Sequence, residues 1–139
     1  MFDEEIYMKH RHPTLIISFS HAFKGFLLVL KHERNIRIHI IATFVALALG
    51  VPLAFTPIEF SLVLIVSGCV IASELFNAAL ERLSDIVKPR VFGYVAEVKD
   101  IAAGAVLFLS LAALCVGLLL YVPKIIDLLL QGSASSGIL

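Results

Sequence analysis

The chain has 139 residues, of which 60% are apolar and 16% charged, and its 11 basic and 11 acidic residues give a formal net charge of zero. Its mean hydropathy of +0.99 lies far from the balance of a soluble domain. This composition excludes an ordinary soluble enzyme and indicates a small integral membrane protein, for which we expect no nucleic-acid partner.

The first elements expected along the chain are a polar leader and a surface helix. Residues 1–13 are polar, and Thr14 is a candidate N-cap for a helix over about 14–32. Apolar residues recur at helical spacing within this segment. The pattern predicts an amphipathic helix that lies on the membrane, and a helix packed on the membrane bundle is the alternative.

Three later stretches are long and apolar enough to cross a bilayer, which takes about 20 helical residues. Pro52 and Pro57 interrupt the helical pattern and predict a short turn between two antiparallel spans. The predicted fold is all-α, with three transmembrane helices plus an N-terminal amphipathic surface helix in a single membrane domain over 14–123. The expected spans are about 36–55, 58–85 and 99–122, followed by a flexible tail over 124–139.

Basic residues mark one side of the expected bundle. Ten of the eleven Lys and Arg residues precede or begin the first span or lie in or beside the connection between the second and third, and only Lys124 follows the last span. The positive-inside rule therefore predicts a cytoplasmic N-terminus and second connection, with an external C-terminus. Three spans enclose little space by themselves, so we expect a homo-oligomer.

Glu74, Asn77 and Glu81 lie within the otherwise apolar second span, at intervals of three and four residues. This spacing puts them on one helical face, and Asp85 continues the stripe one turn later. Carboxylates inside a membrane are costly, and they usually mark a functional site. At 1.5 Å per residue, Glu74 lies about 24 Å along the helix from Ile58, so the stripe descends towards the cytoplasmic surface.

Other polar residues are expected at the same depth. Glu33 and Arg37 lie at the start of the first span, and Lys99 and Asp100 open the third. Hard oxygen ligands at one level suit Mg²⁺, which takes one or two carboxylates together with phosphate oxygens and water. The structural alternatives are an ion-pair network at Glu33, a solvated helix end at Asp85 and a snorkelling anchor at Lys99.

Two other classes of function compete with a phosphate-transfer site at this point. A small ion- or proton-coupled transporter also uses membrane carboxylates, but it predicts them near the midplane rather than on one side. A scaffold without chemistry leaves Glu74 and Glu81 unexplained. Soluble kinase folds are excluded, because the chain has no G-x-x-x-x-G-K-[ST] loop and no H-R-D or D-F-G signature.

Four segments of the chain resemble one family in their order and separation. They are A-F-K-G at 22–25, E-R-N-I-R-I-H at 33–39, E-L-F-N-A-A-L-E-R-L-S-D at 74–85 and K-D-I-A-A-G-A-V at 99–106. The chain resembles the small bacterial membrane lipid kinases, the prokaryotic diacylglycerol kinase and undecaprenol kinase family. The resemblance implies a homotrimer that phosphorylates a membrane lipid alcohol with ATP and Mg²⁺ at the cytoplasmic face. The second and fourth segments are closer to the undecaprenol kinase branch, and diacylglycerol kinase is the alternative.

The resemblance also implies roles for individual residues at matching positions. Glu74 is similar to the family's catalytic base, and Glu33 and Glu81 are similar to the carboxylates that bind metal and ATP. The remaining ATP-contacting positions are Lys99, Asp100 and His21, and the supporting or substrate-binding positions are Asn77, Ser18, Lys24, Arg37 and Asp85. The chain departs from the pattern at Ala78, where a small hydroxyl residue is usual, and in the 88–95 loop, which lacks the usual acidic and histidine residues.

Overall fold

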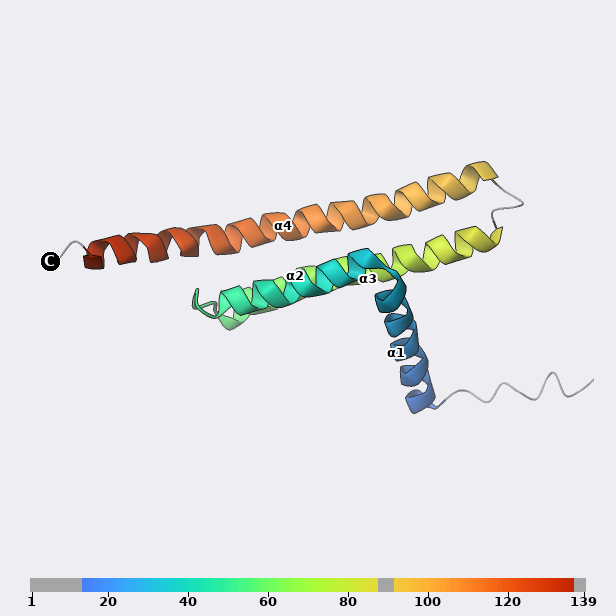
Figure 1. The fold of residues 1–139 in the computed structure, drawn as a ribbon, viewed down its shortest axis with the longest axis horizontal. Coiled ribbons are helices and arrows are strands. Elements are labelled where there is room, and N and C mark those ends of the chain that lie inside the picture. The colour runs from blue at the N-terminus through green and yellow to red at the C-terminus, as the bar shows by residue number, and fades with distance from the viewer. Residues whose placement is uncertain (1–13, 88–91, 137–139) are drawn as a thin grey trace, which may run out of the picture.

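The computed structural model describes residues 14–87 and 92–136, which form four α-helices (Figure 1). In Figure 1, α2, α3 and α4 run side by side, whereas α1 turns away from them where it meets α2. The all-helical prediction is confirmed for these residues. The helices are α1 (Leu15–His32), α2 (Arg34–Gly50), α3 (Pro57–Val87) and α4 (Phe92–Ser136). The predicted leader over 1–13, residues 88–91 of the predicted 88–95 loop and the last residues (137–139) lie outside the described part.

Three of the described helices, namely α1, α3 and α4, are long and apolar enough to cross a membrane. Three membrane-spanning helices were predicted and three are found, but the prediction included α2 in place of α1. With only 17 residues, α2 is too short to count among them. A helix of that length extends about 26 Å, slightly less than the ~30 Å hydrocarbon core. The structure therefore supports a multi-pass membrane protein, while length alone does not separate α1 from α2 as the first span.

The expected first span ends earlier than predicted, at Gly50 rather than near residue 55. The chain turns there because Ala54 adopts a left-handed φ of 51° and its N–H donates to the carbonyl of Val51 over 3.1 Å. A Cβ added to Gly50 would lie 2.9 Å from Cε1 of Phe60 and 3.0 Å from Cδ2 of Phe55. Glycine at this position therefore lets both rings pack against the end of α2.

The last helix is much longer than predicted. It begins at Phe92 rather than Lys99, and it continues through Pro123 to Ser136 instead of giving way to a flexible tail. A proline inside a helix usually costs about 3 kcal/mol, but here the turns on both sides of it are anchored. The Tyr121 hydroxyl donates to the Ala46 carbonyl over 2.6 Å, and Lys124 Nζ donates to the Ala54 carbonyl over 3.2 Å.

The start of α3 is fixed by a capping box. The N–H of Glu59 donates to Oγ1 of Thr56 over 3.3 Å, and the N–H of Thr56 donates to Oε2 of Glu59 over 2.6 Å. Lys124 adds an ion pair to the same carboxylate at 3.0 Å and lies 5.2 Å from the centre of the Phe55 ring. Several polar contacts therefore stabilise the end of the bundle at the turn between α2 and α3. The candidate site lies towards the other end.

A small core joins α1, α2 and α3. Val29, Ile36 and Ala78 form one buried cluster, and Ile36 is completely buried. Many large apolar side chains elsewhere are exposed, as expected for helices that face lipid or other helices rather than water. The buried residues of α3 lie along one stripe, which comprises Val63, Val70, Glu74, Ala78 and Ser84.

Candidate functional site

Glu74 is a buried carboxylate on α3. Its residue surface is only 4% exposed, and it lies on the protein-facing stripe of α3. The side chain of His39, which comes from α2, approaches it with Nε2 3.5 Å from Oε1. Sequence reasoning placed Glu74 at the centre of the site but gave no role to His39, because the contact depends on how the two helices are paired.

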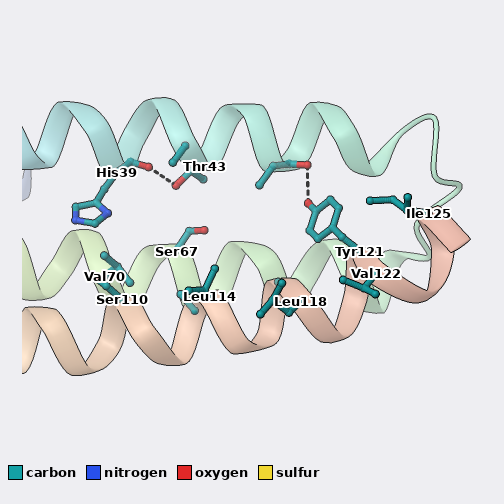
Figure 2. A pocket seen from close by; sticks show the side chains of 14 residues that line it. His39, Thr43, Ser67, Val70, Ser110, Leu114, Leu118, Tyr121, Val122 and Ile125 are labelled. Carbon is teal, nitrogen blue, oxygen red and sulfur yellow. Dashed lines mark hydrogen bonds between the residues drawn. The ribbon is translucent and has the colours of Figure 1, made fainter.

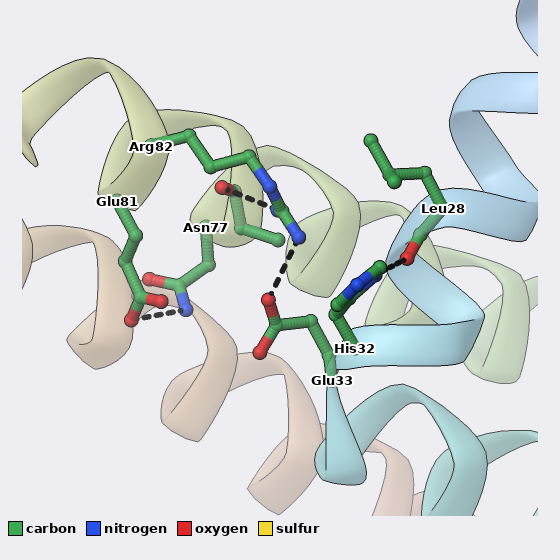
Figure 3. A network of polar contacts seen from close by, with 7 residues as sticks. Leu28, His32, Glu33, Asn77, Glu81 and Arg82 are labelled. Carbon is green, nitrogen blue, oxygen red and sulfur yellow. Dashed lines mark hydrogen bonds and ion pairs between the residues drawn. The ribbon is translucent and has the colours of Figure 1, made fainter. Parts of the chain in front are cut away.

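Asn77 and Glu81 lie one and two turns further along α3. Nδ2 of Asn77 donates to Oε1 of Glu81 over 3.3 Å (Figure 3). The other polar atom of this amide, Oδ1, is buried and has no hydrogen-bond partner. Because a buried acceptor without a donor is costly, this oxygen marks a place where a donor or a cation is favoured.

Glu33 lies between α1 and α2 and forms an ion pair with Arg82 of α3. Nη2 of Arg82 lies 3.0 Å from Oε1 of Glu33, and Nη1 donates to the Ala78 carbonyl over 2.9 Å (Figure 3). Arg82 thus connects Glu33 to α3. From the sequence, Arg82 was used only as one of the basic residues that predict the topology. Its position directly after Glu81 was the signal available in the sequence.

Lys99 and Asp85 form a second ion pair, which bridges α4 and α3. Lys99 Nζ lies 2.7 Å from Oδ1 of Asp85. The two residues were expected to contact nucleotide and substrate, and here they neutralise each other at the surface. Asp100, the neighbour of Lys99, is exposed.

The remaining predicted site residues lie on exposed surfaces of α1 and α2. Ser18, His21 and Lys24 are exposed on α1, and Arg37 is exposed on α2. Because α1 turns away from the bundle (Figure 1), a single chain does not bring the α1 residues to Glu74. Their predicted roles remain predictions.

The residues around Asn77 fit a hard cation, although they do not form a complete cage. Among the described residues, no group of three His, Cys, Asp or Glu side chains comes together to hold a metal ion. Mg²⁺ does not require one, since it usually keeps several waters and takes one or two carboxylates plus phosphate oxygens. The free oxygen of Asn77 beside the Glu81 carboxylate suits such an ion. Oε1 of Glu33 is engaged by Arg82 at 3.0 Å, so Arg82 competes with a cation for this carboxylate.

An apolar groove leads along the bundle to His39. It has a volume of about 500 Å³, within the range of ligand sites in proteins. His39 lies at one end, and Tyr121 and Ile125 lie at the other, with side chains from α2, α3 and α4 along its length (Figure 2). The groove therefore connects a lipid-like environment with the partner of the buried carboxylate.

Comparisons with known proteins show the family of the chain. The model of the family described as prokaryotic diacylglycerol kinase matches residues 20–121. An undecaprenol kinase from Bacillus subtilis (strain 168) is 31% identical over 108 residues, which are 78% of this chain and 88% of that protein. A diacylglycerol kinase from Synechocystis sp. (strain ATCC 27184 / PCC 6803 / Kazusa) is 32% identical over 118 residues, which are 84% of this chain and 67% of that protein. No solved structure matches the chain significantly. The chain therefore belongs to the prokaryotic diacylglycerol kinase family and is a membrane lipid kinase.

Proposed function

We propose that the protein transfers the γ-phosphate of ATP to undecaprenol at the cytoplasmic face of the membrane, with Glu74 as the general base. The observation that carries this proposal is the buried carboxylate of Glu74, whose partner His39 closes one end of an apolar groove. A lipid alcohol has the matching shape, since its chain is apolar and its single polar group is terminal. One extended groove suits a single polyprenyl chain better than the two acyl chains of a diacylglycerol.

The reaction requires one proton transfer and one displacement at phosphorus. Glu74 takes the proton of the lipid hydroxyl, whose oxygen then forms a bond to the γ-phosphorus. The bond between that phosphorus and the bridging oxygen breaks, and ADP leaves. Phosphate transfer depends chiefly on positioning and charge neutralisation, and a small group of polar side chains at helix ends can supply both.

The cytoplasmic end of the bundle supplies the charges for the nucleotide. Glu81, Asn77 and Glu33 are the residues that would hold Mg²⁺, which supplies charge neutralisation at the phosphate oxygens when it is bound. Lys99 is a cation for the phosphates once it leaves Asp85, whose carboxylate now lies 2.7 Å away. The Arg82–Glu33 and Lys99–Asp85 ion pairs therefore compete with the cation and the nucleotide for Glu33 and Lys99.

The packing of the helices favours α2, α3 and α4 as the spans and α1 as a surface helix. These three helices run side by side in Figure 1, and α1 projects away from them where it meets α2. The N-terminus and the connection between α3 and α4 are then cytoplasmic, as the distribution of Lys and Arg requires. In a homotrimer, α1 of one subunit reaches a neighbouring site, which gives Ser18, His21 and Lys24 access to the nucleotide.

Diacylglycerol is the second candidate acceptor, because a relative of similar identity is named a diacylglycerol kinase. The two acceptors are separated by offering purified protein in detergent micelles the γ-labelled nucleotide with undecaprenol, a shorter polyprenol or diacylglycerol. We expect label in the polyprenyl phosphates at the highest kcat/KM. Label in phosphatidic acid alone would replace the proposed acceptor, and ATP hydrolysis without a labelled lipid would contradict the proposed function.

A further inference from the structure

The packing of α2 on α3 fixes His39 against Glu74. Ile36 of α2 and Ala78 of α3 belong to the same buried cluster, and the two helices run antiparallel on either side of a short turn. His39 lies one turn after Ile36, and Glu74 lies one turn before Ala78, so the two side chains meet at the next level of the same contact. The 3.5 Å between Nε2 and Oε1 is the result.

The backbone of His39 also accepts a hydrogen bond from a side chain of the same helix. Oγ1 of Thr43 donates to the His39 carbonyl over 2.7 Å (Figure 2). In the described part of the chain, His39 is also the one basic side chain with a nitrogen within 4 Å of the Glu74 carboxylate. A carboxylate that is 4% exposed is costly to bury without a polar partner, and such a partner also fixes which of its two oxygens is engaged.

We propose that His39 is a positioning residue for the general base. Its ring holds Oε1 of Glu74 and leaves Oε2 to accept the proton of the lipid hydroxyl. This inference rests on the proposed function, since it assigns His39 a role relative to that base. The proton still passes from the lipid to Glu74, and His39 acts only through the carboxylate.

Two substitutions at this position separate the polar contact with Glu74 from packing. His39→Leu fills similar space in an apolar groove but has no polar atom, so the helix pair is expected to fold. His39→Gln places an amide N–H near the position of Nε2 and can donate to Oε1. The control is Ile41→Ala, which changes a 63% exposed side chain on the same stretch of α2.

The assay is phosphate transfer from ATP to the lipid alcohol, with kcat and both KM values determined in mixed micelles. We expect His39→Leu to lower kcat about 10-fold or more, since small errors in the position of a catalytic group are costly, while KM for ATP and lipid stays within about 2-fold of the wild type. His39→Gln should restore kcat to within about 3-fold, and Ile41→Ala should match the wild type. Melting temperatures measured on the same preparations show whether each variant is folded.

The inference is overturned if His39→Leu keeps the wild-type kcat, if Gln and Leu are equally inactive, or if only KM for the lipid rises, which would make His39 a substrate contact. If His39→Leu does not fold, His39→Gln decides alone: a kcat reduced as far as that of Glu74→Gln contradicts the inference, and a kcat near the wild type supports it. Failure of the proposed function is recognised separately, since the wild type would then label no lipid alcohol.

Discussion

Replacing Ile36 by alanine should loosen the contact that aligns α2 with α3. Ile36 is the largest side chain that the described part of the chain buries completely, and it packs with Ala78 directly beside the candidate base. A cavity costs about 24 cal/mol per Å³, so the loss of roughly 75 Å³ of side chain gives about 2 kcal/mol if the surroundings do not collapse. The transfer term adds little here, because unfolded helices in a micelle keep their apolar side chains out of water.

Two measurements test this prediction on one preparation. The free energy of unfolding in mixed micelles should fall by about 2 kcal/mol, and kcat should fall because the register of His39 and Glu74 relaxes. Ile41→Ala, on the exposed side of the same helix, should cost less than about 0.5 kcal/mol and leave kcat unchanged. If Ile36→Ala were no more destabilising than Ile41→Ala, the described packing of α2 on α3 would be wrong.

Three further predictions concern charge and topology. Arg82→Gln should lower the Mg²⁺ concentration for half-maximal activity by a few-fold, because a partly exposed ion pair contributes at most about 1 kcal/mol; an unchanged midpoint would remove Arg82 as a competitor for Glu33. Glu33→Gln and Glu81→Gln should each raise that midpoint about 10-fold or more without unfolding the protein, and a normal Mg²⁺ titration would exclude that residue as a ligand. Reporters fused at the N-terminus and between α3 and α4 should be cytoplasmic and one at the C-terminus external, whereas a cytoplasmic C-terminus would contradict the three-span arrangement.

The helices themselves were largely predictable because their apolar runs are long. The span expected over 58–85 is observed as Pro57–Val87, and the helix expected over 14–32 is observed as Leu15–His32. The end of α4 was not predictable, because Pro123 is a strong local stop signal. It is overridden by contacts of Tyr121 and Lys124 with distant residues, which no local pattern contains.

In the candidate site, too, the arrangement within one helix was predictable, whereas the contacts between helices were not. Spacing within one helix was sufficient to align Glu74, Asn77 and Glu81. The partners from other helices depend on the register in which α2 packs on α3, and this register explains why His39 was given no role and why Arg82 was read only as a topological charge. The α1 positions, such as His21, stay predictions because a single chain leaves them exposed.

The central claim is that Glu74 is the general base, and the variant Glu74→Gln tests it most directly. The amide keeps the shape of the side chain but cannot accept the proton. Lipid phosphorylation should therefore fall about 10²-fold or more, while MgATP affinity stays at the wild-type value and the melting temperature is equal or higher, because a buried carboxylate is costly. A Glu74→Gln protein that phosphorylates the lipid alcohol at the wild-type rate would contradict the mechanism.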